Sequence, residues 1–506
     1  MNHNQIRALS LLIGAAFFAV CIGYSVAVEQ YFLLALATCG VIGTILFLMP
    51  GYIPLLAFGL LTPFAIPLPF IWGFPPVLFV LLFCFLKKSF REGLARHTNQ
   101  RINVMIVPFW IFFGWIFIRY CMNPVLPNAA GFGENVTGFR PYLNYGICFA
   151  LVATLGFFIR VRADISKMIR WMAWVSLFLV LLLVPLMFVR SMGVAAVLQY
   201  LGLYVDMYDN GVFRFVVLPF FGIILVSLSL LPELLQIRTT FRWFLLSIGG
   251  LAVVLGGSRS GLLMASAVVL VIPLLQRNFR KFTVILVAIG AFFTAAYFVG
   301  EKVGRGDAAV LRVLALVSPK VAESTQAAGT WEFREIRWRR AWMEIQNRPL
   351  VGRGYGGVEN AFIWSNWSNF EDARVEIDIA SGGVHNGYIA CALIFGIPAA
   401  LLFIGILAWT IWRNAKMAMR ETSDSFSKNI HAFVCVNLIA YALTIYIGTD
   451  LNNPMLWFLM ALGVLMERVK RAKSSRLPPK EAVVPNRTPL HGALNTGGAG
   501  SARAIV

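Results

Sequence analysis

Long apolar runs recur along the whole sequence and leave the chain few possible folds. A run of about 17 or more apolar residues can cross a bilayer as a helix, and we count about fourteen such spans. Charged residues make up only 13% of the 506 residues, against roughly 25% in soluble proteins. The sequence therefore predicts an all-α polytopic integral membrane protein.

The basic residues indicate how these spans are oriented. A formal net charge of +20 could suggest a nucleic-acid partner. The Lys and Arg residues, however, gather in short loops on alternate sides of the spans, as the positive-inside rule requires. We therefore expect no nucleic-acid partner, and we expect both termini on the cytoplasmic side. This orientation leaves residues 300–385 as one large external loop, followed by a span at 387–412.

The same pattern predicts how the chain is divided. Prolines interrupt the spans at 50–86, and the sequence after Glu467 is basic and then rich in Pro, Gly and Ala, which is typical of a disordered tail. The predicted parts are N-terminal transmembrane helices at 1–210, a core at 211–412 that includes the external loop, C-terminal transmembrane helices at 413–467, and a disordered cytoplasmic tail at 468–506.

Charged residues are nearly absent from the middle of the predicted spans, and His431, near the end of a span, is the nearest case. Coupled transporters and proton pumps usually need ionisable groups at membrane depth, so this scarcity counts against an ion-coupled pump. Seven notable arginines lie on the predicted outer side, against the positive-inside trend, and need a partner or a purpose there. They are Arg140, Arg214, Arg259, Arg334, Arg337, Arg339 and Arg340.

Arg259 stands out because it lies in a tight turn, GGSRSG, between two spans. The glycines of this turn let the backbone approach a ligand closely. The alternative is an arginine that snorkels to lipid headgroups or pairs with an acid of the large loop. Arg214 is less distinctive, since Asp206 or Asp209 could pair with it.

Residues 331–346 are predicted to form a helix that is closed by Pro349. Arg334 and Arg337 are three residues apart and therefore share one side of it. A guanidinium group suits a diphosphate because its planar fork donates two parallel hydrogen bonds to phosphate oxygens. These arginines could anchor a lipid diphosphate and stabilise it as a leaving group.

Acidic residues of the external loop have two possible roles. Glu335 and Glu344 could neutralise Arg339 and Arg340, which we therefore interpret as a solvated face. The acidic run at 371–378 could bind a cation, but a solvated loop is the favoured interpretation. No metal-ligand constellation is evident, so we expect neither a metal nor a cofactor.

His385 is the one of five histidines that is predicted to face outward. It lies beside Gly382, Gly383 and Asn386 at the start of a span. A lone histidine is usually structural. Its place on the same side as the arginines nevertheless favours a functional role, since an imidazole can act as a general base near neutral pH.

Taken in order, these motifs resemble the O-antigen ligase and O-antigen polymerase superfamily of bacterial inner membranes. The resemblance covers residues 210–410. It rests on a Ser-Arg turn at the outer end of a span (Ser258 to Gly261), Arg334 followed by Trp338, the run from Pro349 to Gly354, and His385-Asn386 entering a span.

This resemblance implies a polytopic GT-C-like glycosyltransferase with a periplasmic active site and no essential metal. Such an enzyme transfers a glycan from undecaprenyl diphosphate to an acceptor hydroxyl. Carried over, Arg259 and Arg334 would hold the diphosphate, with Arg214 and Arg337 as weaker candidates. His385 would activate the acceptor.

The resemblance leaves several activities open. A polymerase joins repeat units into exopolysaccharide or O-antigen, whereas a ligase transfers the finished chain to lipid A–core. The extra spans and long tail favour a polymerase, and protein O-glycosylation is a third alternative. Other polysaccharide assembly proteins are candidate partners.

Two alternative functions belong to other classes of protein. A lipid-linked oligosaccharide flippase or a polysaccharide exporter would need a charged path at mid-membrane. A structural scaffold would leave Arg259 and His385 freely replaceable.

Overall fold

The computed structural model describes most of the chain from residue 106 to residue 474. The described residues are 106–122, 139–158, 162–188, 205–207, 213–215, 217–256, 259–302, 329–355, 370–420, 424–448 and 451–474. The predicted spans before residue 106, including the proline-broken region 50–86, lie outside the described residues, as does the tail beyond residue 474.

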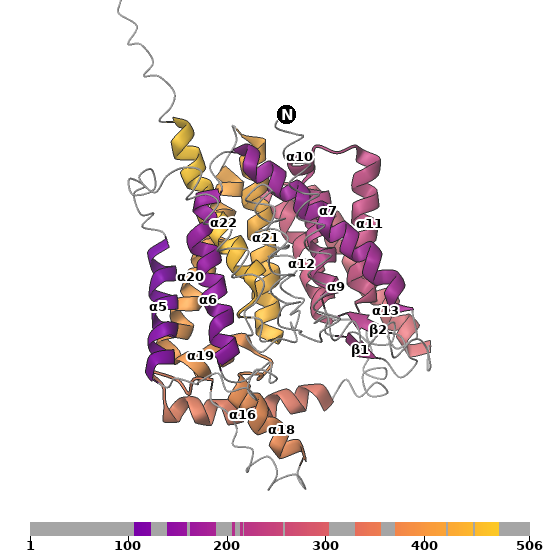
Figure 1. Cartoon of the computed structure of the whole chain (residues 1–506). Helices are drawn as coiled ribbons and strands as arrows, with labels where there is room; N and C mark the ends of the chain where they lie inside the picture. Colours follow the sequence, from indigo (N-terminus) through magenta and orange to yellow (C-terminus); the bar gives the residue numbers. More distant parts are fainter. Residues whose placement is uncertain are drawn as a thin grey trace, which may run out of the picture.

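Helices dominate the described part of the chain, and most run side by side as a bundle (Figure 1). In order, the elements are α5 (Val107–Met122), α6 (Phe139–Phe158), α7 (Arg162–Met187), β1 (Val205–Met207), β2 (Phe213–Phe215), α9 (Leu218–Leu230), α10 (Pro232–Leu235), α11 (Thr239–Leu255), α12 (Arg259–Leu275), α13 (Phe279–Lys302), α16 (Gly329–Asn347), α18 (Phe370–Ser381), α19 (Gly387–Phe395), α20 (Ile397–Arg420), α21 (Ser425–Ile447) and α22 (Pro454–Ser474).

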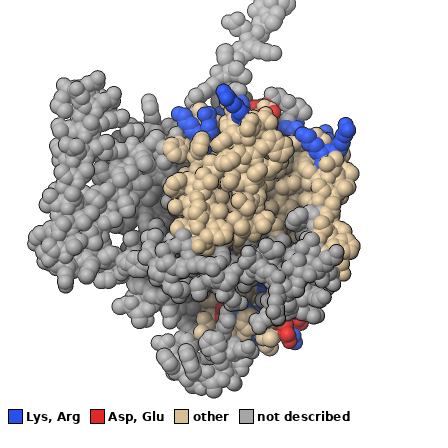
Figure 2. Space-filling model, turned by 90° about the vertical axis from the view of Figure 1, so that its right-hand side faces the viewer, with Lys and Arg blue, Asp and Glu red and all other residues tan. Residues whose placement is uncertain are grey.

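The helices support a multi-pass membrane protein. Within the described ranges, α7, α20 and α21 are long and apolar enough to cross a membrane, and shorter apolar helices include α9, α11 and most of α12. Figure 2 shows a broad uncharged surface between a rim of Lys and Arg side chains and a smaller charged cluster at the other end. The predicted total of about fourteen spans stays a prediction.

The described residues also include one short β-hairpin, which the all-α prediction did not contain. Strands β1 and β2 pair antiparallel, with Val205 opposite Phe215 and Met207 opposite Phe213. In Figure 1 this hairpin lies at the same end of the molecule as α16 and α18. We call this the α16 end.

The predicted span 387–412 is wrong as a single helix. It is divided into α19 and α20 at Gly396, whose φ of 90° is outside the helical range. Hydropathy cannot detect this break, because the residues on both sides are apolar. Near the C-terminus, α22 continues to Ser474, whereas the disordered tail was predicted to begin at residue 468.

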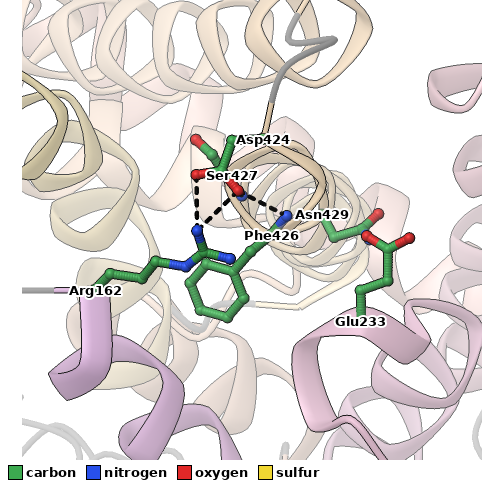
Figure 3. A network of polar contacts seen from close by, with 6 residues as sticks. All are labelled: Arg162, Glu233, Asp424, Phe426, Ser427 and Asn429. Carbon is green, nitrogen blue, oxygen red and sulfur yellow. Dashed lines mark hydrogen bonds and ion pairs between the residues drawn. The ribbon is translucent and has the colours of Figure 1, made fainter. Parts of the chain in front are cut away.

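At the end of the bundle opposite the α16 end, polar contacts join α7, α10 and α21 (Figure 3). Asp424 caps α21 with its carboxylate and pairs with Arg162 of α7 at 3.0 Å. Asn429 of α21 donates a hydrogen bond to Glu233 of α10 at 2.7 Å. These contacts fix the beginning of α7 against α21.

Glycines let α9 and α11 cross closely. A Cβ atom added at Gly222 would lie 2.6 Å from the Gly249 carbonyl oxygen, and one added at Gly249 would lie 2.8 Å from the Gly222 oxygen. Small residues allow this kind of backbone approach between membrane helices. The neighbouring Gly250 faces open space.

We predict that Gly249→Ala destabilises the protein by about 1–3 kcal/mol, because the added methyl group overpacks the crossing. Gly250→Ala is the matched control and should leave the melting temperature unchanged or slightly higher, since alanine favours helix. Thermal unfolding of both purified variants in detergent checks this. Equal melting temperatures would contradict the close crossing.

Candidate functional site

His385 lies in the short connection between α18 and α19. Gly382, with a φ of 73°, ends α18. His385 itself has a φ of 51° and an exposed side chain. Asn386 then caps α19 by accepting hydrogen bonds from the backbone N–H groups of its first turn. A positive φ is uncommon for a residue other than glycine and is a reason to consider function.

Trp338 holds α16 against this connection. Its indole Nε1 donates a hydrogen bond of 2.9 Å to the carbonyl oxygen of Val384, the residue before His385. Arg334 precedes Trp338 by four residues, so the two lie on the same side of α16. Arg334 is half-buried and lies one helical turn from the contact beside His385.

The last turn of α21 contacts the same region. The Tyr388 hydroxyl of α19 donates to the Ala442 carbonyl oxygen at 3.1 Å. A Cβ atom added at Gly387 would lie 2.7 Å from a side-chain carbon of Ile445, so the helices touch closely there. The rings of Trp338 and Tyr446 lie 6.5 Å apart. We call Ala442, Thr444, Ile445 and Tyr446 the α21 hub.

The α21 hub also reaches α12, which begins with Arg259. The Thr444 hydroxyl donates a hydrogen bond to the sulfur of Met264. Met264 follows Arg259 by five residues, about 7.5 Å along the helix axis. The structure thus brings the start of α12, the Arg334 face of α16 and the His385 connection around one helix end. The orientation of the Arg259 side chain is outside the described part of the structure.

Arg214 lies on β2, directly opposite Asp206 of β1. Opposite charges facing each other across strands stabilise a hairpin. The pairing alternative for Arg214 stays a prediction, because the side chains of Asp206 and Arg214 are outside the described part of the structure. The hairpin leads into α9, whose Pro219 lies against Gly256 at the end of α11. Arg214 and Arg259 are therefore at the same end of the bundle.

Arg337 has a partner within the loop. It is 2% exposed, forms an ion pair with Asp378 of α18, and its guanidinium carbon lies 3.6 Å from the centre of the Phe333 ring. This burial and pairing favour a structural role for Arg337 in joining α16 to α18. Its predicted contact with diphosphate has no support from this geometry.

The arginines that we interpreted as a solvated face are neutralised as predicted. Arg339 pairs with Glu335 at 3.3 Å, and Arg340 pairs with Glu344 at 3.3 Å. Arg340 also bonds to Glu376 of α18 at 2.7 Å, and this hydrogen bond is the main cause that raises its pKa.

The acidic run at 371–378 is therefore more than a solvated loop. Glu376 and Asp378 provide countercharges that hold α18 on α16. In the searched residues, no group of three or more His, Cys, Asp or Glu side chains could hold a metal ion. The prediction of a site without metal or cofactor stays a prediction.

Arg119 is a residue of this region that sequence reasoning missed. It lies near the end of α5, is 4% exposed, and donates hydrogen bonds to the carbonyl oxygens of Gly352 at 3.2 Å and Arg353 at 2.5 Å. A Cβ atom added at Gly354 would lie 2.9 Å from its guanidinium. The available signal was a single arginine at the end of an apolar run, on the side where basic residues are rare.

The turn from Pro349 to Tyr355 is also bonded to the end of α19. Arg353 N–H donates to the Leu393 carbonyl at 2.6 Å, Gly354 N–H donates to that of Ile394 at 2.9 Å, and Ile397 N–H donates to that of Pro349 at 2.8 Å. Arg119 therefore clamps the segment that connects α16 to the bundle. This clamp and Trp338 together fix the position of α16.

Comparison with known protein families gives a match, which covers most of the elements described above. Residues 244–404 match the family described as O-antigen ligase. The match includes Arg259, Arg334, Arg337 and His385, and begins after Arg214. It confirms the resemblance to the O-antigen ligase and polymerase superfamily over those residues. A search of curated proteins finds no match.

We predict that Asp378→Asn destabilises the protein by about 3 kcal/mol, because it leaves the buried Arg337 charge without its partner. Glu335→Gln is the control: it removes an ion pair whose side chains are 72% and 54% exposed, so its effect should be about 0.5 kcal/mol or less. Thermal unfolding of both variants measures the difference. Equal effects would contradict a structural role for Arg337.

Proposed function

Because residues 244–404 match the O-antigen ligase family, we propose that the protein is a membrane glycosyltransferase that uses an undecaprenyl-diphosphate-linked glycan as donor. It transfers this glycan to an acceptor hydroxyl at the α16 end. That end would face the periplasm of a bacterium, with the protein in the inner membrane and both termini cytoplasmic.

The observation that carries the proposal is the arrangement around the α21 hub. Three separate elements of the matched region converge there: the start of α12, the Arg334 face of α16 and the connection that bears His385. Transfer from a lipid diphosphate needs a base and cations, and these elements carry one candidate base and two candidate cations. Residues Arg259, Arg334 and His385 form the proposed site.

In the proposed mechanism, the imidazole of His385 removes the proton of the acceptor hydroxyl. The acceptor oxygen forms a bond to the anomeric carbon of the donor as the bond from that carbon to the diphosphate oxygen breaks. Negative charge develops on the departing undecaprenyl diphosphate. Arg259 and Arg334 stabilise it, each charge-assisted hydrogen bond contributing roughly 1.5–3 kcal/mol. Neither a metal nor a cofactor enters these steps.

The weaker candidates take supporting roles. Arg337 stabilises α16 through Asp378 and is not a diphosphate ligand in this proposal. Arg214, opposite Asp206 in the hairpin, borders the site.

Two acceptors are compatible with this chemistry. A polymerase adds the glycan to another lipid-linked repeat unit and so builds exopolysaccharide or O-antigen. The many predicted spans and the long tail favour this assignment. A ligase adds the finished glycan to lipid A–core, and the description of the matched family favours this second candidate.

We predict that His385→Ala lowers the rate of transfer by about 10²–10⁴-fold, the usual contribution of a general base. Arg334→Gln should lower it by about 10- to 100-fold through loss of a charge-assisted hydrogen bond. The measurement is release of free polyprenyl diphosphate from a polyprenyl-diphosphate glycan by purified full-length protein, first alone and then with lipid A–core.

Arg339→Gln is the control, since Arg339 is exposed and already paired with Glu335; it should keep the full rate. Release with chain growth and no added acceptor would identify a polymerase, and release that needs lipid A–core would identify a ligase. A folded His385→Ala protein with the rate of the unchanged protein would refute the mechanism. Absence of release under both conditions would refute the proposed function.

A further inference from the structure

A groove on an exposed side of α7 has no part in the proposed transfer reaction. Its volume is about 680 Å³, and its lining residues are Lys167, Arg170, Trp171, Trp174, Val175 and Phe178. They recur at helical spacing and so form one stripe along α7. The stripe is basic toward the beginning of the helix, aromatic in the middle and apolar farther along.

The aromatic side chains of the stripe are open to the surroundings. Trp171, Trp174 and Phe178 are 44%, 57% and 64% exposed. Phe241 of α11 packs against Trp174 with the ring centres 5.7 Å apart, so a second helix flanks the stripe. Exposed tryptophans of this kind are typical of the level at which lipid headgroups meet the hydrocarbon.

The basic end of the stripe lies at the end of the molecule opposite the α16 end. Arg162, which begins α7, is fixed there by its ion pair with Asp424 (Figure 3). Lys167 and Arg170 follow Arg162 by five and eight residues, about 7.5 and 12 Å along the axis. The stripe therefore runs from this polar rim down into the apolar belt of the bundle.

Lys167 and Arg170 are available to an anionic ligand. Both side chains are exposed, and Arg170 donates a hydrogen bond to the Ser166 hydroxyl at 3.1 Å. Among the residues that the structure describes, no carboxylate pairs with either of them. Two unneutralised cations above a column of aromatic rings match the charge and polarity of a phospholipid with an anionic headgroup.

We propose that this stripe is a binding site for an anionic phospholipid. The lipid phosphate lies between Lys167 and Arg170, and its acyl chains lie along Trp174, Val175 and Phe178. Basic pockets on membrane helices bind acidic headgroups in this way, each Lys or Arg contributing roughly 1 kcal/mol. The site is separate from His385 and Arg334, so it does not depend on the proposed function.

The test uses quenching of tryptophan fluorescence by brominated lipids. The full-length protein is reconstituted in vesicles that contain either brominated phosphatidylglycerol or brominated phosphatidylcholine. The signal of Trp171 and Trp174 is the difference between this protein and the double variant Trp171→Phe/Trp174→Phe. We expect phosphatidylglycerol to quench these two residues preferentially.

Lys167→Gln/Arg170→Gln should lower this preference about tenfold or more, as expected for two lost charges. The matched control is Arg280→Gln/Lys281→Gln, which removes two exposed charges at the start of α13 and should keep the preference. A variant that keeps both charges, Lys167→Arg/Arg170→Lys, should also keep it and separates charge from folding. Equal quenching by the two lipids, or no quenching of Trp171 and Trp174 by either, would overturn the proposal.

Discussion

The arrangement of the α16 end depends on the contacts that the end of α21 makes with other helices. Most of this helix is enclosed by the other helices, and its hub residues touch α12, α19 and α16 at once. Residues far apart in the sequence therefore share one neighbour. Because α21 is itself fixed at its other end by the contacts of Asp424 and Asn429, the position of the candidate site is tied to the whole length of the bundle.

Charges at the α16 end fall into groups that differ in what surrounds them. Arg337 is enclosed and paired, whereas Arg339 is exposed and paired. Arg119 is enclosed and bonded to backbone carbonyl oxygens. A sequence presents all three simply as arginines on one side of a membrane. Only burial and the nature of the partner separate a cation that holds the fold from one that can meet a substrate.

Sequence reasoning predicted the features that depend on local pattern. The helical membrane-protein class and the pairs of Arg339 and Arg340 within α16 follow from hydropathy and spacing, and the family resemblance follows from the order of the motifs. It failed where distant segments meet. The clamp made by Arg119, the countercharge role of Asp378 and the break at Gly396 each depend on a contact between segments far apart in the sequence, and spacing and hydropathy do not show which segments meet.

The bonded turn at Pro349 to Tyr355 has a topological consequence. Its hydrogen bonds to Leu393, Ile394 and Ile397 join the two ends of the intervening segment, which thus forms a loop closed at its neck. Closing a loop costs conformational entropy, and this cost grows only slowly with the number of residues in the loop. Lengthening the part of the loop between residues 355 and 370 should therefore cost little closure entropy, while Glu376 and Asp378 keep α18 on α16. A chain built this way can vary in that part of the loop while the helical bundle stays the same.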